Sequence, residues 1–199
     1  MKSNFNLNNL IRENIKSLKP YSSARDEYKD TNVSEMIFLD ANENPFENGV
    51  NRYPDPNQSN VKKLLSEIKG IDKRNLLLGN GSDEVLDLIF RAFCEPNKDN
   101  IITLPPTYGM YSVLANVNAV ENKKVLLNED FQPQVKQIIV AADVNSKILF
   151  LCSPNNPTGN SFSEASIKEL LLKFKGLVVL DEAYIDFSTK DSWLKNLDK

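Results

Sequence analysis

The chain has 199 residues, of which 41% are hydrophobic and 26% charged, with a formal net charge of −3 and no histidine. This length supports one sizeable core but is short for two full domains. The near-neutral balance gives no electrostatic case for nucleic acid or an anionic membrane as the main partner. Without histidine, the usual zinc sites and His-based triads are excluded within this chain, and we expect no metal.

The N-terminal part of the chain is polar and irregular, with many asparagines and prolines. It lacks the apolar core and cleavage site of a signal peptide, and no apolar run approaches the roughly 20 residues that span a bilayer. We therefore expect a cytoplasmic protein that contacts no membrane. Residues 1–58 should form a helix and extended segments wrapping the core, and residues 59–199 the main domain. Cys94 and Cys152 should be reduced core residues.

Apolar patterns predict alternating strands and helices after a first helix over 61–70, whose apolar face carries Val61, Leu64, Leu65 and Ile68. The predicted strands are, in chain order, 76–79, 100–104, 123–127, 147–152 and 176–181. One predicted helix begins near Ser82, and two others span 108–117 and 134–142. A last predicted helix carries Ile167, Leu170, Leu171 and Phe174 on one face. This alternation predicts an α/β fold with a mainly parallel sheet covered by helices on both faces.

Polar residues follow the predicted strands, where ligands bind in such sheets. Gly81, Ser82 and Asp83 could present backbone amides to a phosphate at a helix start, or could simply cap the helix. Tyr108 could stack on a planar ligand or pack against the core.

Two further strand ends carry an amide and a carboxylate. Asn156 lies in the turn PNNPTG, where it either stabilises the turn or presents its amide to a ligand. Asp181 ends an apolar run, so it needs a cation or strong donors unless it caps the following turn. Together with the first two strand ends, these residues predict one cleft.

These residues bring a family resemblance into view. SPNNPTG, followed 25 residues after Asn156 by the aspartate of VVLDEAYIDF, resembles the fold-type I pyridoxal-phosphate aminotransferases. The similarity runs from about Leu10 to Phe187. The segments that resemble the histidinol-phosphate aminotransferase branch are IRENIKSLKPYSSARDEY, LDANENPF, NRYPDP and RAFCEPNKDNIITLPPTYGMYSV. The resemblance implies that residues 59–199 form an incomplete large domain that binds pyridoxal phosphate.

The resemblance also implies roles for the strand-end residues. Asn156 and Tyr184 would donate to the ring hydroxyl oxygen of pyridoxal phosphate, and Asp181 would pair with its protonated ring nitrogen. Tyr108 would stack on the ring. The backbone amides of Ser82 and Asp83 would hold the phosphate.

For substrate and assembly, the resemblance points to the N-terminal part. Tyr21, in PYSSAR, and Asn44, in LDANENPF, would contact the substrate. Tyr53, in NRYPDP, would reach the cofactor phosphate of the neighbouring subunit, which implies a homodimer. The implied reaction converts histidinol phosphate and 2-oxoglutarate to imidazole acetol phosphate and glutamate, in histidine biosynthesis.

The lysine that forms the Schiff base in this family follows the aspartate by roughly thirty residues, whereas this chain ends at Lys199. Lys190, Lys195 and Lys199 do not stand in the family's context for that lysine. The chain therefore resembles the N-terminal portion of the enzyme, and we expect these 199 residues alone to be inactive.

Two alternatives stay open at this point. One is a related decarboxylase acting on threonine phosphate, whose strand-end motifs are similar, although PYSSAR, NRYPDP and PTYGMYSV favour the aminotransferase. The other is a non-catalytic fragment that binds the cofactor.

Overall fold

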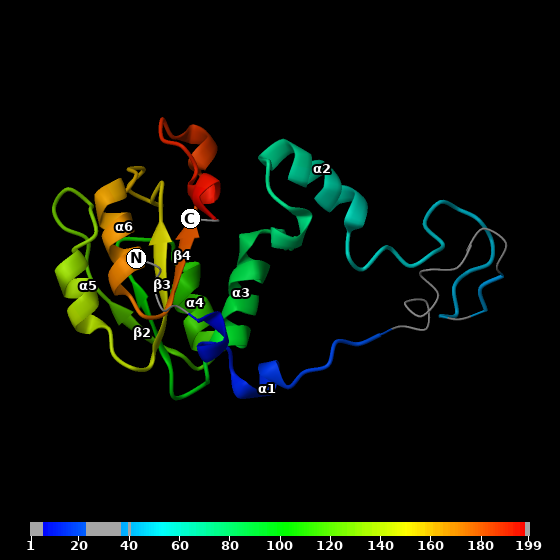
Figure 1. Cartoon of the computed structure of the whole chain (residues 1–199), viewed down its shortest axis with the longest axis horizontal. Helices are drawn as coiled ribbons and strands as arrows, with labels where there is room; N and C mark the ends of the chain where they lie inside the picture. The colour runs from blue at the N-terminus through cyan, green and yellow to red at the C-terminus, as the bar shows by residue number, and fades with distance from the viewer. Residues whose placement is uncertain (1–5, 23–36, 40, 198–199) are drawn as a thin grey trace. The chain divides into compact units, whose positions relative to one another are not determined.

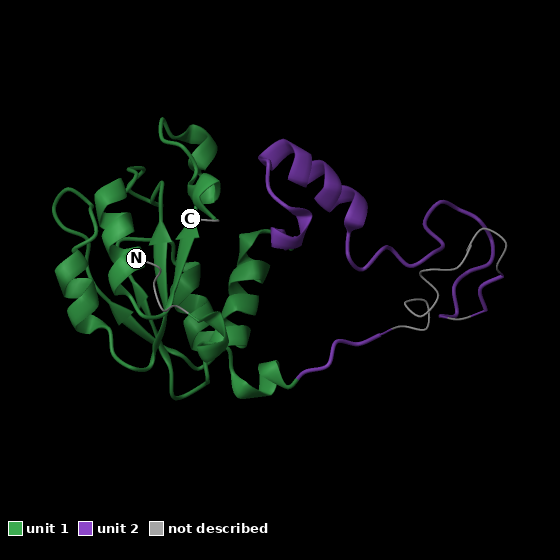
Figure 2. Cartoon of the chain, viewed as in Figure 1, with its two compact units in different colours: residues 1–17, 79–199 green, residues 18–78 purple. Residues whose placement is uncertain are grey.

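The structure is a computed structural model, which describes residues 6–22, 37–39 and 41–197. By its internal contacts the chain divides into two units, residues 1–17 with 79–199 (unit 1) and residues 18–78 (unit 2), coloured separately in Figure 2. Each unit is described by itself. The predicted division between residues 58 and 59 stays a prediction.

Unit 1 is built on a four-stranded sheet in the order β2-β1-β3-β4 (Figure 1). Every pair of neighbouring strands is parallel. This confirms the predicted α/β fold with a parallel sheet. The strands are β1 (Asn100–Thr103), β2 (Glu121–Lys124), β3 (Ser146–Cys152) and β4 (Leu177–Asp181).

Helices cover both faces of this sheet, as the sequence predicted (Figure 1). α3 (Ser82–Phe93) and α4 (Met110–Val117) bury Phe90 and Leu114 in the core on one face. α5 (Val135–Ala141) and α6 (Glu164–Lys173) bury Ile138 and Leu170 in the core on the other. The shorter helices of unit 1 are η1 (Leu7–Asn9), α1 (Glu13–Lys16), η5 (Ile185–Phe187) and η6 (Trp193–Asn196).

The strands supply side chains to the two cores alternately. Ile101 and Ile148 belong to the core beneath α3 and α4, while their neighbours Ile102 and Leu149 belong to the core beneath α5 and α6. Successive side chains of a strand point to opposite faces, so a strand covered on both faces must be apolar at every position. This explains the continuous apolar runs from which these strands were predicted.

Three details of the prediction were wrong. Residues 76–79 form no strand, and Leu77 is 59% exposed. A strand forms only where a neighbour accepts its hydrogen bonds, and none of the described strands pairs with this segment. The third strand was predicted over 123–127 but spans Glu121–Lys124, although Val125 and Leu127 beyond its end are buried. Leu171, predicted on the apolar face of α6, is 48% exposed.

Unit 2 contains α2 (Ser59–Lys69) and the short helix η4 (Lys73–Asn75). α2 confirms the first predicted helix, and it ends at Gly70, whose φ of +66° is the left-handed conformation that glycine adopts without strain. Its predicted apolar face is exposed, with Val61 at 56% and Ile68 at 76%. The pattern that predicted the helix therefore did not predict burial within unit 2.

Both cysteines are free and buried, as predicted. Burial raises the pKa of the Cys94 thiol to about 12 and also raises that of Cys152. Among the residues that the structure describes, no helix is long and apolar enough to cross a membrane. The same residues contain no group of three or more acidic or cysteine side chains that could hold a metal ion.

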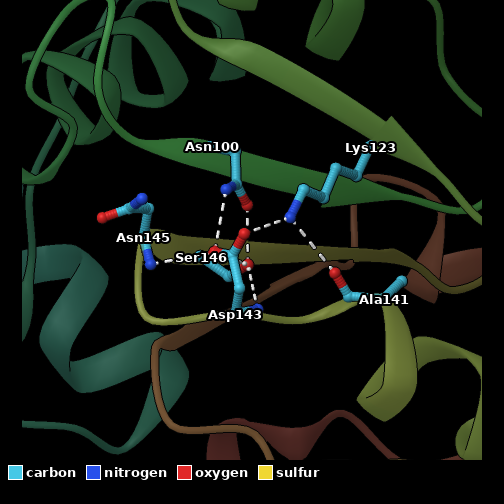
Figure 3. Close-up of polar contacts among 6 residues, drawn as sticks. All are labelled: Asn100, Lys123, Ala141, Asp143, Asn145 and Ser146. Carbon is cyan, nitrogen blue, oxygen red and sulfur yellow. Dashed lines mark hydrogen bonds and ion pairs between the residues drawn. The ribbon is translucent and has the colours of Figure 1, made fainter.

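A polar cluster joins β1, β2 and β3 (Figure 3). It includes Asn100 and Ser146, the first residues of β1 and β3, and therefore lies away from the carboxyl ends of these two strands. Asn100, which is 2% exposed, donates from Nδ2 to Oδ1 of Asp143 over 3.0 Å and accepts from Oγ of Ser146 over 2.6 Å. Nζ of Lys123 lies 2.5 Å from Oδ2 of Asp143 and also donates to the carbonyl oxygen of Ala141. The ammonium of Lys123, the amide of Asn100 and the backbone N–H of Asn145 hold the pKa of Asp143 well below its usual range.

This cluster predicts an acid-dependent contribution to stability. A carboxyl whose pKa is lowered by folding stabilises the fold above its ordinary pKa of 3.8, and the stabilisation is lost as the pH falls through the lowered value. We expect wild type to be more stable than Asp143→Asn at pH 7, with the difference shrinking below about pH 4. Urea unfolding across this range measures it. Asp130→Asn, which removes a carboxyl without a described cation partner, is the control, and a pH-independent difference for Asp143→Asn would contradict the prediction.

Gly176, just before β4, is required by close backbone packing. A Cβ at this position would lie 2.5 Å from the carbonyl oxygen of Lys147, the second residue of β3. We expect Gly176→Ala to lower the free energy of unfolding by about 1–3 kcal/mol, since the strands must shift apart. Gly109→Ala is the matched control, because its backbone is helical and a Cβ there meets nothing within 4 Å. Equal denaturation midpoints for the two variants would refute this reading of Gly176.

Candidate functional site

The topology of unit 1 identifies one edge of the sheet as a binding edge. β1 leads into α4 on one face, and the neighbouring strand β3 leads into α6 on the other face. The loops after these two strands therefore diverge, which opens a crevice at their carboxyl ends. Residues 104–109 follow β1 and residues 153–163 follow β3.

Asp181 is the last residue of β4 and lies at this edge. Parallel pairing sets it opposite Cys152, the last residue of β3. Its Oδ2 accepts a hydrogen bond of 2.7 Å from the phenol of Tyr111, and its Oδ1 accepts one of 3.0 Å from the backbone N–H of Ala183. The bond from Ala183 caps the following turn, which was the alternative that the sequence offered, and the phenol of Tyr111 supplies a donor to the other oxygen.

Tyr111, on α4, is the site residue that the sequence reasoning missed. Its ring is fully buried and stacks on Phe150 with centroids 4.6 Å apart. Burial, followed by the negative charge of Asp181, raises the pKa of the Tyr111 phenol far above its ordinary value, so it stays a donor. Its position three residues after Tyr108 was a signal, because residues at this spacing share one side of a helical turn.

Tyr108 lies against Tyr111 and reaches the start of α3. The two rings meet edge to face, with centroids 5.6 Å apart. The Tyr108 phenol lies 3.2 and 3.3 Å from the two carboxylate oxygens of Asp83. Burial and this hydrogen bond raise the pKa of Tyr108. Two tyrosines therefore connect the start of α3 to the end of β4.

The start of α3 has no side-chain cap. Gly81 is the N-cap residue with a φ of +79°, and no side chain caps the helix there. The backbone N–H groups of the first helical turn, which begins at Ser82 and Asp83, have no partner within the helix. Glu84 turns its carboxylate back to accept from the backbone N–H and the side-chain amide of Asn80. The first turn thus presents amides without a side-chain cap.

The two adjacent asparagines after β3 have different surroundings. Asn155 is 2% exposed and ties the loop together: its amide donates to the carbonyl of Pro106 and the hydroxyl of Thr158, and its Oδ1 accepts from the hydroxyl of Thr107. Asn156 is partly exposed, and no described residue hydrogen-bonds its side chain. Asn155 therefore builds the turn, whereas Asn156 lines a cavity beside it.

A cavity of about 590 Å³ opens beside this loop and is lined by Asn156, Tyr184, Phe187 and Lys190, among others. Tyr184 is 45% exposed, and no described residue hydrogen-bonds its phenol. Lys190 donates from Nζ to the carbonyl oxygen of Phe162 over 3.2 Å. Two predicted ligand donors, Asn156 and Tyr184, thus share one cavity wall.

The other predicted site residues belong to unit 2. The backbone N–H of Tyr53 donates to Oε1 of Glu43 over 2.7 Å, and Glu43 also pairs with Arg52. Oδ1 of Asn44 accepts from the backbone N–H of Phe46. The side chains of Tyr53 and Tyr21 are 69% and 92% exposed. The roles predicted for these three residues stay predictions.

Known proteins provide a comparison for this chain. The family model of aminotransferase class I and II matches residues 27–197. The histidinol-phosphate aminotransferase of Flavobacterium johnsoniae is 69% identical over 98% of this chain and 56% of its own length. The chain thus spans about half the length of the curated relatives it matches.

Two solved structures are similar in fold. L-threonine-O-3-phosphate decarboxylase from Porphyromonas gingivalis has a TM-score of 0.57 at 26% identity, over 70% of this chain and 42% of that one. Histidinol-phosphate aminotransferase from Sinorhizobium meliloti, in complex with pyridoxal-5'-phosphate, has a TM-score of 0.62 at 23% identity, over 70% of this chain and 38% of that one. At 23% identity, the second likeness supports the fold alone.

The different roles of Asn155 and Asn156 can be tested by measuring how each substitution changes the free energy of unfolding. Asn155→Ala removes three hydrogen bonds made by a side chain that is 2% exposed, so we expect it to lower the free energy of unfolding by about 2–3 kcal/mol. Asn156→Ala is the matched control, and should change it by no more than about 0.5 kcal/mol. Urea denaturation of both variants measures the difference, and a larger loss for Asn156→Ala would reverse our assignment.

Proposed function

The chain belongs to the aminotransferase class I and II family, and we propose that it forms the cofactor-binding part of a histidinol-phosphate aminotransferase that uses pyridoxal phosphate. The observation that carries this proposal is the arrangement around Asp181, whose carboxylate is clamped by two donors at the binding edge of the sheet. Curated relatives of 52–69% identity that bear this enzyme's name support the choice of reaction.

The residues of the crevice fit pyridoxal phosphate by their chemistry. Asp181 offers a carboxylate for a protonated ring nitrogen, and the first turn of α3 offers uncapped amides for a phosphate. Asn156 and Tyr184 offer an amide and a phenol that no described residue occupies. A phosphate, a cationic nitrogen and a ring oxygen would each find a matching group.

Each residue then has a separate task. Pyridoxal phosphate, when bound, supplies an electron sink for carbanion chemistry. Asp181 would accept a hydrogen bond from the ring nitrogen and keep it protonated, and Tyr108 would cover one face of the ring. Asn156 and Tyr184 would donate to the ring oxygen. The amides of Ser82 and Asp83 would hold the phosphate, while the Asp83 carboxylate stays engaged by Tyr108.

Unit 2 would contribute residues that bind the substrate and residues that contact a neighbouring subunit. We assign Tyr21 and Asn44 to binding histidinol phosphate, 2-oxoglutarate or glutamate, and Tyr53 to the cofactor phosphate of a neighbouring subunit in a homodimer. Their exposed positions support this, since Tyr21 and Tyr53 have phenols available to a partner. The protein would act in the cytoplasm on small molecules, without nucleic acid or membrane partners.

A second candidate is a threonine-phosphate decarboxylase, favoured by the likeness to the Porphyromonas gingivalis enzyme at 26% identity. The two candidates share the strand-end residues and differ in the bond broken at the substrate. The aminotransferase reading is stronger, because the relatives that carry its name are more than 50% identical across nearly the whole chain.

A chimaera tests the proposed function. Residues 1–199 would be continued by the part of the Flavobacterium johnsoniae relative that the match does not cover. We expect this protein to transfer the amino group of histidinol phosphate to 2-oxoglutarate, and Asp181→Asn to lower turnover by about a hundredfold or more, since a preorganised charge is lost. Coupled detection of glutamate measures the reaction.

Two controls sharpen this experiment. Release of carbon dioxide from threonine phosphate, without glutamate formation, would favour the decarboxylase instead. The 199-residue chain alone, treated with pyridoxal phosphate and borohydride, should show only scattered labelling of its lysines and no turnover. Near-normal turnover of the Asp181→Asn chimaera would remove Asp181 from the role proposed here.

A further inference from the structure

Asp181 is held from two sides by groups of different origin. The phenol of Tyr111 comes from α4 and binds Oδ2, whereas the N–H of Ala183 comes from the turn after β4 and binds Oδ1. Among the described residues, each carboxylate oxygen therefore has one side-chain or backbone donor and keeps further lone pairs. The plane of the carboxylate is therefore fixed by one donor from a helix and one from the turn that follows its own strand.

Tyr111 is itself fixed by an aromatic stack. Its ring lies parallel to that of Phe150 at 4.6 Å and 11°, and Phe150 stacks in turn on Phe90 of α3 at 5.5 Å. Tyr108 meets its edge at an interplanar angle of 87°. Because Phe150 packs against its face and Tyr108 against its edge, the phenol of Tyr111 cannot turn away from Asp181 without disturbing the core.

We propose that Tyr111 is a positioning residue that fixes the Asp181 carboxylate so that its remaining lone pairs select a cationic ring nitrogen. This inference rests on the proposed function, since it assumes that pyridoxal phosphate is the ligand. It concerns an aromatic phenol that acts through Asp181 and does not itself touch the cofactor. Burial raises the pKa of the Tyr111 phenol, so the phenol stays protonated and remains a donor to Asp181.

The test compares two ligands that differ at one atom. Pyridoxal phosphate carries the ring nitrogen, and its 1-deaza analogue has carbon there. In the 199-residue chain, we expect Tyr111→Phe to weaken equilibrium binding of pyridoxal phosphate about tenfold, as for one charge-assisted hydrogen bond, and to leave binding of the deaza analogue unchanged. Phenylalanine keeps the ring in its stack, so this variant removes the hydroxyl, with its hydrogen bonds to Asp181 and to the Cys152 thiol, and leaves the ring in place.

Tyr108→Phe is the matched control. It removes a neighbouring phenol that contacts Asp83 and not Asp181, so its effect should be the same for both ligands. Equal weakening of both ligands by Tyr111→Phe would mean that Tyr111 acts only on packing, and would overturn the proposal. Unchanged binding of pyridoxal phosphate would overturn it as well.

A second measurement separates this inference from the proposed function. Without any ligand, the denaturation midpoints of Tyr111→Phe, Asp181→Ala and the double variant form a cycle. We expect the double variant to lose less than the sum of the two single losses, because both remove the same hydrogen bond. Additive losses would disprove the clamp. If the losses are non-additive but the chain binds neither ligand, the hydrogen bond between Tyr111 and Asp181 exists but pyridoxal phosphate is not the ligand. That result would reject the proposed cofactor, and with it the role inferred for Tyr111.

Discussion

The parallel register of β3 and β4 is the constraint on which the candidate site depends. It sets Cys152 beside Asp181, so both strands end at the same level of the sheet. The backbone N–H of Ser153 then donates to the carbonyl of Asp181 over 2.9 Å, which extends the pairing past the last residues. A shift of one residue would turn the Asp181 side chain to the opposite face of the sheet, away from Tyr111.

In two pairs of nearby residues of the same type, one residue stabilises the local structure and the other is available to contact a ligand. The side chain of Asn155 hydrogen-bonds Pro106, Thr107 and Thr158, and so joins the loop after β1 to the loop after β3. Asn156 has none of these contacts. Tyr111 is buried against Phe150, whereas Tyr108 is partly exposed beside it. In each pair the buried member fixes the position from which the other can face a ligand.

The sequence predicted the parallel sheet and the gathering of Asp83, Tyr108 and Asp181, because continuous apolar runs followed by polar turns depend only on local pattern. It failed at residues 76–79, since an apolar run forms a strand only beside a partner, and a partner is a property of the tertiary structure. It also left the two asparagines undistinguished. Which of them is buried depends on the loop after β1, some fifty residues earlier in the chain. The exposure of Val61 and Ile68 shows the same limit, since helical periodicity states which face is apolar but not what covers it.

Two of the groups proposed to meet the cofactor are oriented by hydrogen bonds within the chain. The carboxylate of Asp181 accepts from the phenol of Tyr111 and the backbone N–H of Ala183, and the phenol of Tyr108 donates to Asp83. Groups that are already oriented need no further ordering when a ligand arrives, so less of the interaction energy is lost to conformational entropy. The same orientation restricts what can bind: a neutral ring atom opposite Asp181 would leave a partly desolvated carboxylate without a donor on its open side. The geometry that lowers the entropic cost of binding is therefore also the geometry that would discriminate between ligands.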